Sequence, residues 1–402
     1  MARWLILAIL LLTGAAHAAP PDVYTLDDLL RLADENNPGI VAAARAVEAA
    51  EGRLVTARLY PNPAIAATQE DMPTDGIQAD KGKSSVALEQ PIVIGNRRRA
   101  AANAGRAEIA ALKAALESER HAVWGELHQF LVEMLYLERA FQLQWSLVED
   151  AEADAAAVPE QDRPRMEFEV QRLRTGLLTT VTRRSVVELE IRRLVGGIVV
   201  PRNRLRGALI EKLDGRELAI STEDTVAEHP DTMAAQSRIE QDRRGIDLAR
   251  AEIVPDITIR AGATYDQRED DTMAMVGVSI PIPLWNRNQG RIREARANVA
   301  IREAERDTVE QDLSARIDTL LQLLNELDTL AQDYATTLVP MAEHAHTAAR
   351  DAVAAGGGTA LELLDAQRTR SEARSEALRY RYELNRSLAE LRHLRRYAPP
   401  PQ

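Results

Sequence analysis

The chain has 402 residues, of which 45% are hydrophobic and 28% are charged, a composition that can bury a core and excludes a largely disordered chain. Aromatic residues make up 4%, so the core is expected to be alanine-rich and helical rather than built on large rings. Acidic residues outnumber basic ones by 62 to 50, and the net charge of -12 makes nucleic acid a poor partner. Because the sequence contains no cysteine, disulfides, thiolate metal sites and lipidation of an N-terminal cysteine are excluded.

The first eighteen residues have the pattern of a cleavable secretory signal peptide. Arg3 precedes an apolar run from Trp4 to Leu12, and Ala16 and Ala18 form a small-residue cleavage site. The alternative, a membrane anchor, is disfavoured because the run is much shorter than the roughly 20 residues that span a bilayer as a helix. No later stretch is apolar enough for a membrane helix, so a place in a membrane would have to be reached through strands.

An internal repeat divides the rest of the chain into two similar units. The segment around Pro38 recurs around Pro230, and the segment around Pro91 recurs around Pro281. The repeat predicts a first unit over residues 19–209 and a second over residues 210–402.

Both units are expected to contain the same elements in the same order. Each begins with a short helix, at 26–35 and at 221–228, followed by a helix that opens at Pro38 or Pro230. Alternating apolar and polar residues then predict paired strands at about 63–70 and 84–92, and at about 255–266 and 273–282. A long helical hairpin closes each unit, over residues 96–195 and 286–396.

The long helices are unusual for a globular domain. At about 1.5 Å per residue, the proline-free run from Asn96 to Ala157 would reach roughly 90 Å. Apolar residues spaced three and four apart in the second unit predict a narrow coiled-coil seam of Leu313, Ile317, Leu320, Leu321, Leu324, Leu327 and Leu330.

Four strands per chain are too few to cross a membrane alone. Every backbone polar group of a membrane strand must be paired, and known barrels begin at about eight strands. Several chains are therefore expected to pool their strands, and three chains would supply twelve.

Four segments carry a resemblance to a known family. They are LYPNP, QPIVIGNRR, PIPLWNRNQG and GGGTALELLDAQRT, and their order and duplication resemble the outer-membrane efflux proteins of the TolC type. The form of the third segment is most similar to the cobalt-zinc-cadmium resistance (CzcC-like) branch.

The resemblance implies a mainly α fold with a small β part. Three chains would form a homotrimer with a 12-stranded barrel in the lipid of the Gram-negative outer membrane and a helical tunnel in the periplasm. The protein would be a passive exit duct with no enzymatic activity, cofactor or resident metal, working with a periplasmic adaptor and an inner-membrane pump of the resistance-nodulation-division class. The cargo would be heavy-metal cations, and the alternatives are drugs or amphiphiles, a type I secretion substrate, or a periplasmic helical scaffold without a pore.

The resemblance also implies a periplasmic gate. In the family, acidic rings near the start of the last helix close the tunnel, and Glu362 and Asp365 stand at those positions. Their spacing places both on one helical face, although two solvated carboxylates near a helix N-terminus would show the same spacing. Adaptor docking is expected at the hairpin tips, which contain Pro159, Asp162, Gly356, Gly357, Gly358 and Thr359. Gly358 replaces an arginine that tethers neighbouring hairpins in some relatives, and Pro159 stands where a glycine turn is usual.

The histidines are not expected to form a metal site. His344 and His346 are two residues apart and point to different sides of a helix, and His121 and His128, which could share a face, are expected at the surface. The basic run from Arg97 to Arg99 is expected near the inner headgroups of the membrane.

Overall fold

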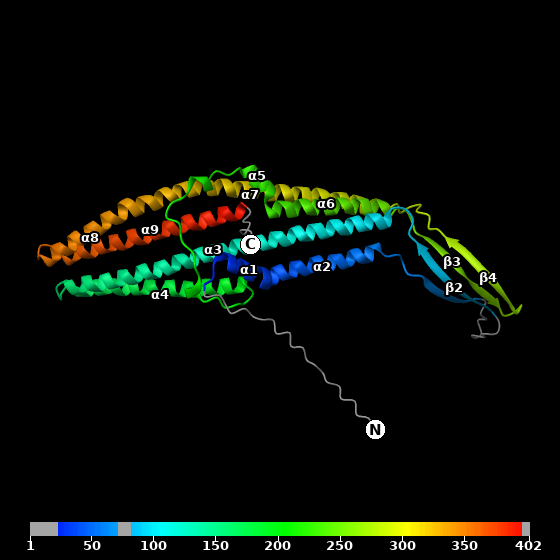
Figure 1. Ribbon diagram of the computed structural model, residues 1–402, viewed down its shortest axis with the longest axis horizontal. Helices are drawn as coiled ribbons and strands as arrows, with labels where there is room; N and C mark the ends of the chain where they lie inside the picture. The colour runs from blue at the N-terminus through cyan, green and yellow to red at the C-terminus, as the bar shows by residue number, and fades with distance from the viewer. Residues whose placement is uncertain (1–22, 71–81, 396–402) are drawn as a thin grey trace, which may run out of the picture.

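The computed structural model describes residues 23–70 and 82–395. It is an elongated body with a small sheet at one end and, at the other, the turns that connect the helices of the two hairpins (Figure 1). The first unit contains α1 (Leu26–Asn36), α2 (Pro38–Arg58), β1 (Ala64–Glu70), β2 (Lys83–Ile92), α3 (Arg97–Ala157) and α4 (Arg163–Leu194). The second contains α5 (Thr222–Glu228), α6 (Pro230–Ala251), β3 (Ile257–Asp266), β4 (Asp271–Ser279), α7 (Gln289–Asp333), α8 (Val339–Ala354) and α9 (Ala360–Leu394). The proposed signal peptide, residues 1–18, lies outside the described residues.

The two units start their long helices in the same way. Pro38 and Pro230 stand at the first positions of α2 and α6, where a missing amide hydrogen removes no helical bond. The side chain before each proline caps its helix. Asn37 Oδ1 accepts a hydrogen bond from Gly39 N at 2.8 Å, and His229 Nδ1 accepts one from the backbone N of Asp231 at 3.2 Å. The expected helix starts at the repeated prolines are therefore confirmed.

The four strands form one antiparallel sheet in the order β1-β2-β3-β4. Ile65, Leu88, Ala261 and Val276 lie in one row across it, because they are successive register partners. The strand β4 ends at Ser279, earlier than the expected residue 282. The following residues alternate with Pro281 and Pro283, and proline has no N–H with which to continue a ladder.

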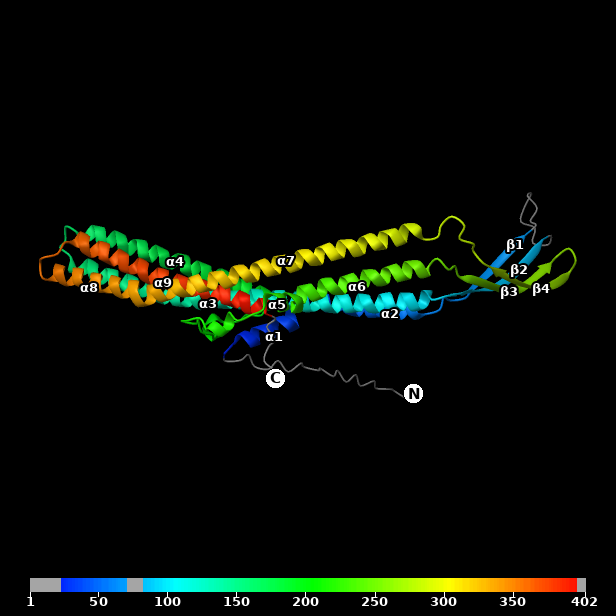
Figure 2. The same ribbon diagram turned by 90° about the horizontal axis from the view of Figure 1, so that it is seen from above.

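The helices form a curved layer whose neighbours change along its length. Next to the sheet the order is α2, α3, α6, α7, and toward the far tips it is α4, α3, α9, α8 (Figures 1 and 2). Near the middle, α1 and α5 pack against this layer, and α7 packs on α9. None of the described helices is both long and apolar enough to cross a bilayer.

The predicted coiled-coil seam is confirmed over most of its length. Ile317, Leu320, Leu324 and Leu327 are buried against side chains of α9, namely Leu384, Leu388, Leu391 and Leu394. Leu330 is 38% exposed and lies at the end of the seam. Beyond it, the long helical run is interrupted by a π-helical turn over Tyr334–Leu338, which ends two residues before Pro340. We attribute this turn to the proline, which cannot donate the next helical hydrogen bond.

Candidate functional site

The sheet has one apolar and one polar face, and within residues 23–70 and 82–395 no further strand pairs with the outer edge of β1 or of β4. The apolar face is open, since Val276 is 79% exposed and Ile65 is 78% exposed. The polar face carries two cross-strand ion pairs, Lys83 with Asp266 at 3.5 Å and Glu89 with Arg260. An exposed apolar face and unpaired outer edges are unfavourable in water.

The basic run after β2 joins the sheet to the helices. Arg97 donates to Asp256 at 2.8 Å, just before β3, and the Arg98 guanidinium lies 3.6 Å from the ring centroid of Tyr60. Trp285, 86% exposed, lies at the same junction beyond β4. These contacts hold the helices at a set position relative to the strands.

Glu362 and Asp365 are both exposed near the start of α9, while Leu363 and Leu364 between them are buried in the tip cluster with Val158. Glu362 also has a local role, because its carboxylate accepts from Thr359 N at 2.9 Å as half of a capping box. Those hydrogen bonds to the carboxylate lower the pKa of Glu362. The two carboxylates are thus free to face a tunnel, and their role as a gate stays a prediction.

The remaining predicted tip residues lie at the turns. Pro159, Gly356 and Gly357 are exposed, and Asp162 precedes α4 without a capping hydrogen bond from its side chain. Gly356 has φ of 77°, which favours glycine. A Cβ on Gly358 would approach Val353 N to 2.9 Å, so a larger side chain there would force this tight turn to shift.

A network that sequence reasoning missed ties the two hairpins together above these tips. Glu169 on α4 is 1% exposed, accepts from Arg368 on α9 at 2.9 Å and is paired with Arg172. Burial pushes the pKa of Glu169 upward, but the hydrogen bonds from the two arginines outweigh it and hold that pKa below its usual value. Asp150 on α3 accepts from Arg370 on α9 at 2.9 Å. Opening the tips by moving α9 away would break these pairs.

The expectation of a surface position is wrong for His121, and His128 is only partly exposed. His121 is 4% exposed, and its ring stacks on His393 at 3.7 Å between centroids and meets His229 edge-on at 4.9 Å. Gly125 makes room for this cluster, because a Cβ there would lie 2.6 Å from His393 Nε2. His346 is buried and hydrogen-bonded to Asp154, whereas His344 is exposed.

Two of the buried or half-buried histidines, His393 and His128, stay uncharged near neutral pH. Burial is the main cause that lowers the pKa of His393 to about 3, and the neighbouring His121, His229, His128 and Arg316 lower it further. Burial and then Arg392 lower the pKa of His128 to about 4. Among residues 23–70 and 82–395, no three or more histidine, aspartate or glutamate side chains are arranged to hold a metal ion.

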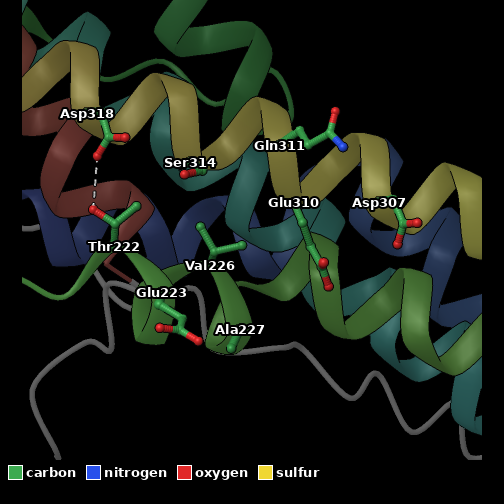
Figure 3. Close-up of a pocket in the computed structure, with 9 residues that line it drawn as sticks. All are labelled: Thr222, Glu223, Val226, Ala227, Asp307, Glu310, Gln311, Ser314 and Asp318. Carbon is green, nitrogen blue, oxygen red and sulfur yellow. Dashed lines mark hydrogen bonds between the residues drawn. The ribbon is translucent and has the colours of Figure 1, made fainter.

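A groove of about 640 Å³ lies between α5 and α7 (Figure 3). Its lining is acidic, and Thr222 on α5 donates to Asp318 on α7 at 3.1 Å across one end. The carboxylates of this acidic groove are those of Glu223, Asp307, Glu310 and Asp318.

The comparisons with known proteins agree with this architecture. The family model described as outer membrane efflux protein matches residues 29–161 and 222–395, and the chain belongs to that family. It is therefore an outer-membrane efflux channel, a transport duct and not an enzyme.

One known protein and two solved structures are similar to this chain over most of its length. The cobalt-zinc-cadmium resistance protein CzcC of Cupriavidus metallidurans is 28% identical over 377 residues, which cover 87% of this chain and 84% of CzcC. A membrane protein from Pseudomonas aeruginosa has a TM-score of 0.76 at 18% identity, over 92% of this chain and 89% of that one. The open state of the Neisseria gonorrhoeae outer membrane channel MtrE has a TM-score of 0.75 at 18% identity, over 92% of this chain and 88% of that one.

Proposed function

We propose that the chain is the outer-membrane exit duct of a tripartite efflux system and that it conducts heavy-metal cations. In this proposal an inner-membrane pump of the resistance-nodulation-division class expels the cargo, and a periplasmic adaptor docks on the hairpin tips. The protein is exported with a cleaved signal peptide, residues 1–18, and it works as a homotrimer.

The main observation that supports the proposed exit duct is the four-stranded sheet. Its apolar face suits lipid, and its polar face, with the Lys83–Asp266 and Glu89–Arg260 pairs, suits a water-filled lumen. The outer strands β1 and β4 each need a further strand, and three chains would bring twelve strands into one closed ring.

Two observations support a cationic cargo. The similarity to CzcC covers most of both chains. The exposed carboxylates of Glu362 and Asp365 would form acidic rings in a trimer, and crowded like charges attract cations and resist anions. Neither observation depends on a bound metal, because the ion would be cargo and not a resident cofactor.

The test is the growth of a deletion strain against cobalt, zinc, cadmium, copper and silver salts, beside bile salts, dyes and antibiotics. We expect sensitivity confined to metals and its reversal by the wild-type gene. Sensitivity to amphiphiles instead would assign the duct to drug efflux and overturn the metal cargo. The mass of the detergent-solubilised protein tests the assembly, and a stable monomer would overturn the shared barrel.

A further inference from the structure

The polar face of the sheet carries two methionines. Met273 and Met275 of β4 are the register partners of Thr264 and Gly262 on β3, and direct partners project from the same face of a sheet. Because side chains alternate along a strand, Thr264 and Gly262 share the face of Arg260, one half of a cross-strand ion pair. Both thioethers therefore project from the polar face, whereas the valines, isoleucines and leucine of the four strands project from the other one.

Small side chains surround the two methionines. The two rows of register partners that contain them consist otherwise of Thr68, Ser85 and Thr264, and of Ala66, Ala87 and Gly262. Met273 is 42% exposed, and Met275 is half-buried. The thioethers are the longest side chains of the two rows, and packing in a core does not explain Met273.

The polar face is concave at the row of Met275. A Cβ on Gly262 would lie 2.8 Å from the Cβ of its register partner Ala87. Directly opposite Cβ atoms of an ordinary antiparallel pair are about 4.5–5.5 Å apart. The side chains of this face therefore converge, which is the curvature that a lumen-facing side of the proposed duct needs.

Both sulfur atoms can reach one ion. At roughly 3.4 Å per residue, the backbones of Met273 and Met275 are about 7 Å apart along the strand. Methionine is flexible and its sulfur is polarisable, so the two side chains can bend toward a point between them. Thioethers are soft ligands of the kind that Cu(I) selects, and Ag(I) is soft for the same reason. Zn²⁺ is bound instead by thiolate, imidazole and carboxylate, groups that the eight residues of these two rows do not contain.

An acidic row lies next to the methionines, on the side of the β3–β4 turn. It consists of the register partners Glu70, Lys83, Asp266 and Asp271, in which three carboxylates face one ammonium group. Asp271 is two residues from Met273 on β4, so this row projects from the polar face as well. The β3–β4 turn is at the end of the sheet far from the helices (Figure 2). Its excess negative charge raises the local concentration of cations beside the thioethers.

We propose that Met273 and Met275 form a transient binding site for a soft monovalent cation, Cu(I) or Ag(I). The acidic row attracts the cation and the two thioethers select it by their softness. The inference rests on the proposed duct, in which the polar face lines the lumen, and it names one class of metal cargo. A site of two thioethers in an open lumen suits conduction, because a conducted ion must be able to leave its site.

Silver binding by the solubilised full chain tests this site. The probe is silver nitrate in a chloride-free buffer, and equilibrium dialysis followed by metal analysis counts the bound ions. The variant with Met273→Leu and Met275→Leu keeps the size of both side chains, and it should bind about one silver ion per chain fewer than the wild type. The matched control is Met233→Leu with Met341→Leu, which removes two thioethers that are 47% and 63% exposed on the separate helices α6 and α8. It should bind silver like the wild type.

Oxidation of the wild-type protein gives a second readout at single residues. Peroxide converts accessible methionines to the sulfoxide, and the masses of proteolytic peptides report each position. Silver ions should protect Met273 and Met275 and leave the oxidation of Met341 unchanged. This measurement needs no variant, so it tests the site even if the leucine variant assembles poorly.

The outcomes separate this site from the proposed function. Equal silver binding by the wild type and the Met273/Met275 variant, or oxidation of both residues that silver does not slow, would overturn the site. A trimeric mass and a metal-sensitive deletion strain would then leave the duct standing. Silver binding that the variant loses, beside a deletion strain sensitive to amphiphiles alone, would keep the site and overturn the metal cargo. A stable monomer by native mass would remove the shared lumen and overturn both.

Discussion

Asp154 on α3 and His346 on α8 form a hydrogen bond of 2.7 Å in which both side chains are almost fully buried, at 1% and 2% exposure. The two residues are 192 positions apart and belong to different helical hairpins. The helices α3 and α8 contact each other over a short stretch only, and the two helical hairpins meet mainly where α3 packs on α9. The hydrogen bond is therefore a direct link between α3 and α8.

Removing one partner of this pair should destabilise the tip region. We expect His346→Ala to lower the free energy of unfolding by about 3–5 kcal/mol, because the Asp154 carboxylate would be left buried without its partner. Urea unfolding of the solubilised protein, followed by circular dichroism, measures the change. His344→Ala is the matched control, since His344 is exposed two residues away and its loss should cost about 0.5 kcal/mol or less. Equal effects of the two variants would contradict the role of the pair.

A glycine in the sheet should be intolerant of any side chain. A Cβ on Gly262 of β3 would lie 2.2 Å from the backbone oxygen of Val86, so Gly262→Ala should force the strands apart and cost about 1–3 kcal/mol. Gly277 on β4 faces open space, and Gly277→Ala should leave assembly unchanged. The amount of heat-resistant assembled protein in outer-membrane fractions measures both. Normal assembly of Gly262→Ala would contradict the close approach of β2 and β3.

Neighbouring leucines on α7 should differ in their contribution to stability. Leu324 is 0% exposed in the seam with α9, and Leu324→Ala should cost about 2–5 kcal/mol through lost burial and the cavity that remains. Leu323 is 38% exposed, and Leu323→Ala should cost clearly less. Urea unfolding of the two variants provides the comparison, and similar midpoints would show that the seam does not carry the packing.

Local patterns predicted the elements, because each depends on neighbouring residues. The alternation from Ile257 to Tyr265 indicated β3, and the leucine spacing on α7 indicated the face that packs on α9. The family resemblance supplied the way the elements assemble. The π-helical turn before Pro340 was missed because an isolated proline in a helical run can be accommodated by a kink, a break or a wider turn.

The contacts between hairpins could not be predicted in the same way. Glu169 and Arg368 are 199 residues apart, and their pairing depends on the register in which α4 and α9 meet. His121 on α3 is buried because the end of α9 and the start of α6 both pack against α3 at this position. A histidine on a charged helix looks like a surface residue until the helices that cover it are placed.

The histidine cluster should make the fold sensitive to acid. The folded chain keeps His393 neutral down to a pKa of about 3 and His128 to about 4, whereas the unfolded chain takes up protons near pH 6.5. The unfolded state therefore binds more protons below pH 6.5. As the pH is lowered from about 6.5, the free energy of unfolding should decrease until the folded rings are protonated as well.

Thermal unfolding of the solubilised protein between about pH 7.5 and about pH 4 measures this dependence. His393→Gln should give a shallower fall, because one depressed pKa is removed. Exposed His344 provides the control, and His344→Gln should keep the wild-type slope. A slope that His393→Gln leaves unchanged would show that the acid sensitivity has another source.

The acidic pair on α9 should set the preference of the channel for cations. Glu362→Gln with Asp365→Asn removes both charges and keeps an acceptor at position 362 for the Thr359 amide, so the capping box is preserved, whereas alanine would break it. We expect the cation preference in single-channel recordings to fall, because the crowded negative charge is gone. The variant with Glu160→Gln and Glu167→Gln removes two exposed charges at the other tip and is the matched control. If the two double variants keep the same preference as the wild type, Glu362 and Asp365 are helix-start carboxylates without a role in selection.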